Sequence, residues 1–224
     1  IKYISEFQPE YYLPFAGTYT LTGKLSNLQS LRGIANIDNA YSFFENYFLS
    51  KKLSDKIKPL MLNPDSTFDV SIGEYDKNYE KVDMKKYGTY IINNLKNKKF
   101  SYELEDPPAF DEIYEISKKA FKRFLDKMLF NNVNLETDIF IKANGKSLKL
   151  GMNKKLSIVE TNSISLDSKK YISIDTDIRL LKRLLMGPKY AHWNNAEIGS
   201  HLKFYRKPNV LERNIHSALI YFHC

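Results

Sequence analysis

A proline pair, Pro107 and Pro108, constrains the fold of this chain more than any other feature of its sequence. Proline has no backbone N–H and a fixed φ, so neither a helix nor a central strand can run through two prolines in a row. The pair therefore predicts a boundary, which we place between about residue 98 and residue 110. We expect one domain over residues 1–100 and a second over residues 110–224.

The composition indicates a folded protein with no membrane span. Of the 224 residues, 43% are hydrophobic and 14% aromatic, which is enough for a core and argues against disorder. The longest apolar runs fall far short of the roughly 20 residues that cross a bilayer. Cys224 is the one cysteine, which excludes an intrachain disulfide and favours a reducing, cytoplasmic location. The chain opens at Ile1 without signal-peptide features, so we expect it to be the C-terminal piece of a larger protein.

The net charge of +8 does not by itself indicate a nucleic-acid partner. A nucleic-acid footprint needs basic residues gathered on one face. Here the lysines occur as scattered pairs and never as a block, in a sequence also rich in Asn, Ile and Tyr. We interpret the excess as a solvated surface and do not expect nucleic acid as a partner.

Apolar spacing in the first region predicts two helices and two short strands. Tyr41, Phe44 and Phe48 recur at three- to four-residue intervals and predict a helix over residues 37–49. A second helix is expected over 85–97, with strands over 11–14 and 58–62.

The second region predicts an α+β domain. An amphipathic pattern predicts a helix over residues 111–131. Asn144-Gly145 is a strong hairpin signal between two strands. The strands are expected to form one antiparallel meander, followed by a helix that ends at Gly187 and by a closing helix. The expected ranges are strands 133–142, 148–151, 155–160 and 170–174 and helices 175–186 and 210–222.

No short catalytic motif is present, but one stretch concentrates chemically useful side chains. Trp193, Glu197, His201 and Arg206 lie within it. They would line a substrate pocket if the indole stacked on a ring and Arg206 bound a carboxylate or phosphate. In the alternative, which we favour, Trp193 fills the core and Glu197 and Arg206 form a structural ion pair.

Three short motifs resemble a known family. They are YYLPFAGTYTL, KPLMLNPDSTFDV, and a C-terminal W-N-x-A-E-I-G-S with R-x-P and L-x-Y-F-H. They resemble the metallo-β-lactamase-fold proteins that include CMP-N-acetylneuraminate hydroxylase-like and UDP-N-acetylmuramate hydroxylase-like members. The family's L-x-PGD-type segment is here Leu62-Asn63-Pro64-Asp65, without the glycine.

The resemblance implies an incomplete metallo-β-lactamase-like αββα domain followed by a sterol-carrier-like α+β module. It further implies a metal-dependent hydrolase or hydroxylase-like parent enzyme, acting on a small molecule such as a sugar nucleotide or an envelope glycan precursor. The family's HxHxDH-type ligand motif is absent from this sequence, so no metal ligand can be assigned here. Zn or Fe is expected in the complete parent protein, and the present chain is expected to be inactive alone.

A second hypothesis is a non-enzymatic module that binds a lipid or an anionic polymer. It requires a set of basic side chains to converge on one face, and binding would then weaken steeply with salt. The set is Lys118, Lys119, Lys122, Arg123, Lys154 and Lys155.

Overall fold

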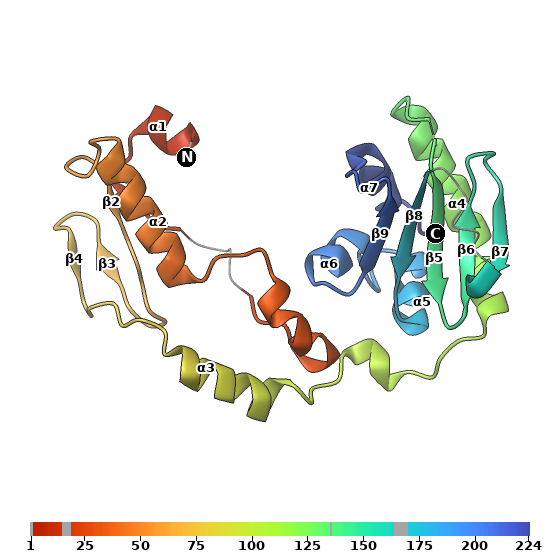
Figure 1. Ribbon diagram of the computed structural model, residues 1–224, viewed down its shortest axis with the longest axis horizontal. Coiled ribbons are helices and arrows are strands. Elements are labelled where there is room, and N and C mark those ends of the chain that lie inside the picture. Colours follow the sequence, from red (N-terminus) through yellow and green to blue (C-terminus); the bar gives the residue numbers. More distant parts are fainter. Residues whose placement is uncertain (1, 15–18, 135, 164–169) are drawn as a thin grey trace. The chain divides into compact units, whose positions relative to one another are not determined.

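The chain folds into two compact units, shown in the computed structural model of Figure 1. The structure describes residues 2–14, 19–134, 136–163 and 170–224. Unit 1 spans Ile1–Lys98 and unit 2 spans Lys99–Cys224. The fold is mixed α and β, as the sequence predicts. The motif residues Phe15, Ala16 and Gly17 lie outside the described residues.

Unit 1 contains helices and two pairs of very short strands, β1–β2 and β3–β4, and no larger sheet among its described residues. Its strands are each two residues long, so the strands predicted over 11–14 and 58–62 shrink to the parallel pair β1–β2. The predicted second helix begins as α3 and continues as a π-helix. The bounds are α1 Lys2–Phe7, β1 Tyr11–Tyr12, the 3₁₀ helix η1 Gly23–Leu31, α2 Ile37–Ser50, β2 Lys58–Pro59, β3 Phe68–Asp69, β4 Glu74–Tyr75, α3 Met84–Tyr90 and η2 Ile91–Leu95.

Helix α2 is the best-formed element of unit 1 and confirms the helix predicted from aromatic spacing. Asn36 caps it, because its side-chain oxygen accepts a hydrogen bond from the Asn39 amide at 2.7 Å. Its inner face carries Phe48, which packs with Ile4 and Ile57 in a small buried cluster. Unit 1 is thus centred on one helix and a few apolar side chains.

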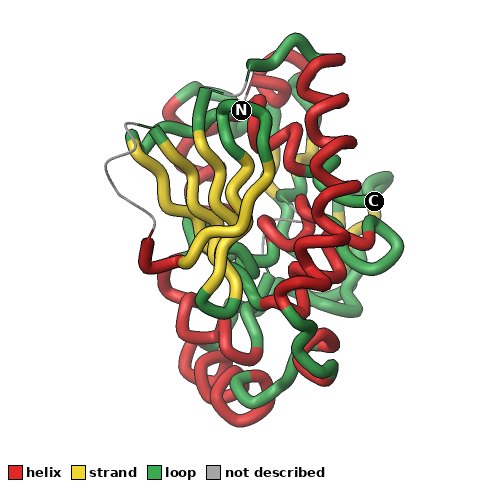
Figure 2. The backbone as a smooth tube through the Cα atoms, turned by 90° about the vertical axis from the view of Figure 1, so that its right-hand side faces the viewer, coloured by secondary structure: helices red, strands yellow, loops and turns green. Residues whose placement is uncertain are grey.

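Unit 2 is built on a five-stranded sheet in the order β7-β6-β5-β8-β9, which Figure 2 shows as yellow strands. The hairpin predicted at Asn144-Gly145 is confirmed, with φ values of 54° and 80° at its two turn residues. The bounds are η3 Ser101–Leu104, α4 Phe110–Phe130, β5 Asp138–Ala143, β6 Lys146–Leu150, β7 Leu156–Glu160, η4 Thr161–Ser163, β8 Tyr171–Asp175, α5 Ile178–Met186, α6 Trp193–Ile198, β9 Lys203–Lys207 and α7 Arg213–Leu219.

The sheet differs from the prediction in two ways: one strand has a different neighbour, and one strand was not predicted. Strand β8 does not extend the meander beyond β7; it pairs in parallel with β5, with Ile139 opposite Ile172. Strand β9, which the sequence pattern did not predict, pairs antiparallel with β8. Both errors have one cause: an apolar or alternating pattern identifies a strand but not its neighbour.

The helices of unit 2 pack on one face of the sheet. Alternate residues of the central strands, including Ile139, Ile141 and Ile174, point into a single buried cluster with side chains of α4, α5, α6 and α7. Trp193 and Phe222 belong to the same cluster. Unit 2 therefore has a complete core of its own. Within the described part of the chain, no helix has the length and hydropathy of a membrane span.

Candidate functional site

Trp193 belongs to the core of unit 2. Its side chain is 3% exposed, and its indole Nε1–H donates a hydrogen bond to the carbonyl oxygen of Phe222 at 2.9 Å. The two rings lie 6.0 Å apart. The indole is therefore buried, and both its ring and its N–H contact Phe222, which follows α7.

Glu197 and Arg206 meet through a third residue, His216. The Glu197 carboxylate lies 3.1 Å from His216 Nδ1, and Arg206 Nη2 lies 3.2 Å from His216 Nε2. The Arg206 guanidinium also lies over the Phe204 ring, 5.1 Å from its centroid. The direct Glu197–Arg206 ion pair that we favoured is not among the ion pairs of the described residues. His216 was missed because helix spacing indicates only that it neighbours the buried Ile215.

His201 lies in a different environment. Its Nδ1 is 3.1 Å from the Tyr102 hydroxyl, and its ring meets Phe100 edge-on at 4.6 Å. Both aromatic residues come from the segment just before α4. His201 lines a shallow hollow of about 280 Å³. The four side chains of the predicted pocket thus have separate partners, and only Glu197 and Arg206 share one.

The residues present do not form the metal site that the resemblance implies. Among the residues that the structure describes, no three His, Cys, Asp or Glu side chains lie close enough to hold an ion. Such a site needs at least three convergent ligands. We therefore derive no metal-dependent step from this chain.

The basic residues of the second hypothesis come from two elements. Lys118, Lys119, Lys122 and Arg123 lie along α4, whereas Lys154 and Lys155 lie in the turn between β6 and β7. Lys118 pairs with Glu115 at 2.6 Å. Convergence of the whole set on one face stays a prediction.

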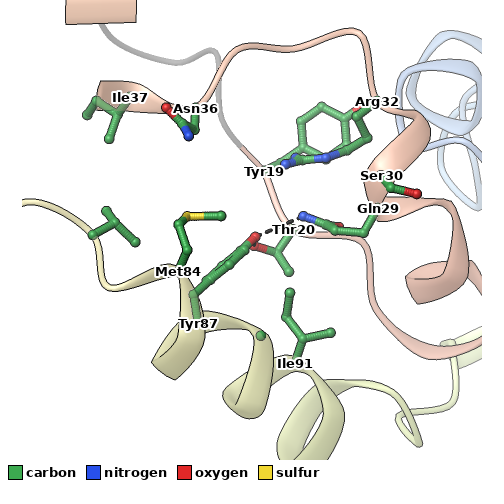
Figure 3. Close-up of a pocket in the computed structure, with 12 residues that line it drawn as sticks. Tyr19, Thr20, Gln29, Ser30, Arg32, Asn36, Ile37, Met84, Tyr87 and Ile91 are labelled. Atoms are coloured by element: carbon green, nitrogen blue, oxygen red, sulfur yellow. Dashed lines mark hydrogen bonds between the residues drawn. The ribbon is translucent and has the colours of Figure 1, made fainter. Parts of the chain in front are cut away.

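A further cavity lies in unit 1, where the sequence did not predict a site. Its volume is about 480 Å³, within the range of small-molecule pockets. Figure 3 shows side chains from α2, α3 and η1 and from the segments between them pointing into it. The lining residues are Tyr19, Thr20, Gln29, Ser30, Arg32, Asn36, Ile37, Val82, Met84, Tyr87, Gly88 and Ile91.

One wall of this cavity is polar and already hydrogen-bonded. Gln29 Nε2 donates to the Tyr87 hydroxyl at 2.8 Å, and Thr20 Oγ1 lies 2.7 Å from the same hydroxyl. Gln29 Oε1 accepts from the backbone N–H of Leu21 at 2.8 Å. These bonds join η1 to α3 and fix the shape of the wall.

Arg32 also lines the cavity but takes no part in these hydrogen bonds. Its guanidinium lies over the Tyr19 ring at 5.1 Å. Its Nε and Nη1 atoms are buried and have no hydrogen-bond partner among the residues that the structure describes, while the residue as a whole is half-buried. None of the residues that line the cavity is acidic. Arg32 therefore brings a positive charge to the cavity, and no described lining residue carries a negative charge to match it.

Comparison with known proteins gives no match: no family model, no curated protein and no solved structure is similar to this chain. Function must accordingly be argued from the residues themselves.

Proposed function

We propose that this chain is the C-terminal part of a metal-dependent hydrolase or hydroxylase-like enzyme. Unit 1 would contribute to a metallo-β-lactamase-like αββα domain, and unit 2 would be a sterol-carrier-like α+β module. The substrate class proposed is a small molecule such as a sugar nucleotide or an envelope glycan precursor. The metal ligands would come from protein outside the residues described here.

The observation that carries this proposal is the imbalance between the two cores. The buried apolar cluster of unit 1 has three members, Ile4, Phe48 and Ile57, whereas that of unit 2 has 26 described members. A unit of about 100 residues ordinarily buries well over half of the surface that its unfolded chain exposes. Unit 1 instead exposes much of its apolar surface, which supports its being one part of a larger domain. The most exposed large hydrophobic side chains of unit 1 are Tyr3, Phe7, Leu31, Val70 and Ile72.

A backbone detail supports the proposed family. The segment Leu62-Asn63-Pro64-Asp65 resembles the family's L-x-PGD-type segment but lacks its glycine. Asp65 has a φ of 60°, in the left-handed region that glycine adopts without strain. A left-handed residue at this position is compatible with a turn of the kind that a glycine would form, which agrees with the proposed resemblance.

Unit 2 supports the second half of the proposal. It has an open sheet covered on one face by helices and a core independent of unit 1. Such a module can be attached to a catalytic domain without supplying any catalytic group, which agrees with the purely structural roles of Trp193 and His216.

The test is metal analysis of the intact gene product. The complete open reading frame that contains these residues should be expressed and its bound metal measured by inductively coupled plasma mass spectrometry. We expect Zn or Fe in the whole protein and none retained by the 224-residue chain, which is the matched control. A whole protein that holds no metal, or a reading frame with no further coding sequence, would refute the proposal.

A further inference from the structure

We propose that the unit 1 cavity binds a small amphipathic anion, with its charged group at Arg32 and its apolar body against α3. We expect the 224-residue chain to bind this anion without any further protein. This binding does not depend on whether the metal-dependent function is correct.

The Arg32 guanidinium has two buried nitrogens with no acceptor among the described residues. A cation shielded from water without a counter-charge or hydrogen-bond acceptor is costly, and such groups in native proteins call for a partner. Among the described residues, Arg32 Nε and Nη1 have no acceptor, and the guanidinium carbon lies 5.1 Å from the Tyr19 ring centroid. A carboxylate or phosphate supplies both the charge and the acceptors that the guanidinium fork binds best.

Several of the other residues that line the cavity are apolar. Ile37, Val82, Met84 and Ile91 supply an apolar surface to the cavity. Figure 3 shows Ile91 beside Tyr87 and Thr20, and Ile37 on the far side of the cavity from them. Val82 and Met84 remain 42% and 54% exposed. An alkyl chain or aromatic ring that covered them would remove apolar surface from water.

The polar wall of the cavity carries no negative charge that could pair with Arg32. Tyr87, Gln29 and Thr20 already bond one another, so they shape the cavity without neutralising Arg32. Asn36 uses its side-chain oxygen to cap α2, and Figure 3 shows its amide nitrogen on the cavity side. The free donors of the site therefore match an acceptor-rich, negatively charged ligand.

The test is isothermal titration calorimetry of the whole chain with four probes. Decanoate and decyl phosphate carry both features, decanol lacks the charge, and inorganic phosphate lacks the apolar body. We expect one or both amphipathic anions to bind at least about tenfold more tightly than decanol and inorganic phosphate, because a charge-assisted pair contributes that much. The tighter of the two anions identifies the acidic group.

Variants separate the site from general surface binding. Arg32→Gln should weaken anion binding about tenfold or more, and Arg32→Lys should have an intermediate effect. Arg213→Gln, an exposed arginine in unit 2, is the matched control and should leave binding unchanged.

A cavity-filling variant keeps the test independent of folding. Gly88 lies within α3, lines the cavity, and has open space where a side chain would begin. Gly88→Leu should therefore abolish binding while leaving the thermal midpoint of the chain unchanged or raised, since leucine favours helix over glycine. Equal binding of decanol and decanoate, or full binding by Arg32→Gln or Gly88→Leu, would overturn the proposal.

Discussion

At the scale of single residues, unit 2 contains a buried carboxylate whose environment differs sharply from that of the surface pairs. Asp138 begins β5 and is 6% exposed. Its carboxylate accepts a hydrogen bond from the Met152 amide at 2.9 Å and lies 2.7 Å from Lys149 Nζ. It thereby ties β5, β6 and the following turn together.

Replacing Asp138 should therefore be far more damaging than replacing a surface acid. We expect Asp138→Ala to lower the free energy of unfolding by about 2–4 kcal/mol, because it leaves a buried amide and a half-buried ammonium without their acceptor. Glu115→Ala, which breaks the exposed pair with Lys118, is the control and should give no measurable change. Urea unfolding followed by Trp193 fluorescence measures both. Equal effects of the two variants would contradict this account.

The type of a residue allowed one role in the candidate site to be predicted from the sequence, but not the others. The core role of Trp193 followed from its type, because a lone large aromatic residue beside helical segments is usually packed inside. The bridge formed by His216 did not, because it depends on how α6, β9 and α7 meet in space. Arg32 was missed altogether, since nothing in the sequence marks a cation that lacks an acceptor.

At the scale of elements, hydrogen bonds between distant loops and helices hold unit 1 together in place of a large core. The Tyr79 hydroxyl donates to Asp38, in the first turn of α2, at 2.7 Å. Burial, and then the hydrogen bond to Asp38, raise the pKa of Tyr79 from 10.0 to about 12. The folded state therefore favours the neutral hydroxyl.

This shift predicts a specific alkaline effect. The contribution of Tyr79 should be complete below pH 10 and lost as the pH rises toward 12, because the unfolded state then loses its proton more readily than the folded state. Tyr79→Phe should be less stable than the wild type at pH 8, and the difference should shrink between pH 10 and pH 12. Urea unfolding followed by circular dichroism gives both values. Tyr90→Phe, at an exposed position, should show no such convergence.

Helices and strands with a strong hydrophobic periodicity were predicted well. Elements whose place depends on which strands pair in the sheet were predicted poorly. Helices α2 and α4 and the Asn144-Gly145 hairpin came from local patterns alone. Strand β9 is only five residues long and alternates exposed and half-buried side chains that include Arg206. Its place beside β8 is set by the sheet, so the sequence pattern could not reveal it.

At the scale of the whole molecule, the two units differ in how much apolar surface they bury. Unit 2 has one continuous core under its sheet, and unit 1 has a small cluster around Phe48. Stability should therefore be unequal along the chain.

Hydrogen exchange followed by mass spectrometry should show this directly. Amides of β5, β6 and β8 should exchange at least about tenfold more slowly than those of α2 and α3, because local opening of unit 1 exposes little additional core. A chain that contains only residues 99–224 should keep its circular dichroism and buried Trp193 fluorescence. Uniform exchange along the chain, or an unfolded 99–224 chain, would contradict the division into units.

The parallel pairing of β5 with β8 has a consequence for synthesis on the ribosome. The hairpins β5–β6 and β6–β7 can form as soon as their residues emerge, but the exposed edge of β5 stays unpaired until β8 has been made. Strand β8 in turn leaves its own edge open until β9 follows. During that interval the nascent chain presents a strand edge of the kind that pairs with other chains. Slow codons or pauses between these strands would therefore be expected to raise aggregation of newly made protein, without changing the stability of molecules that have finished folding.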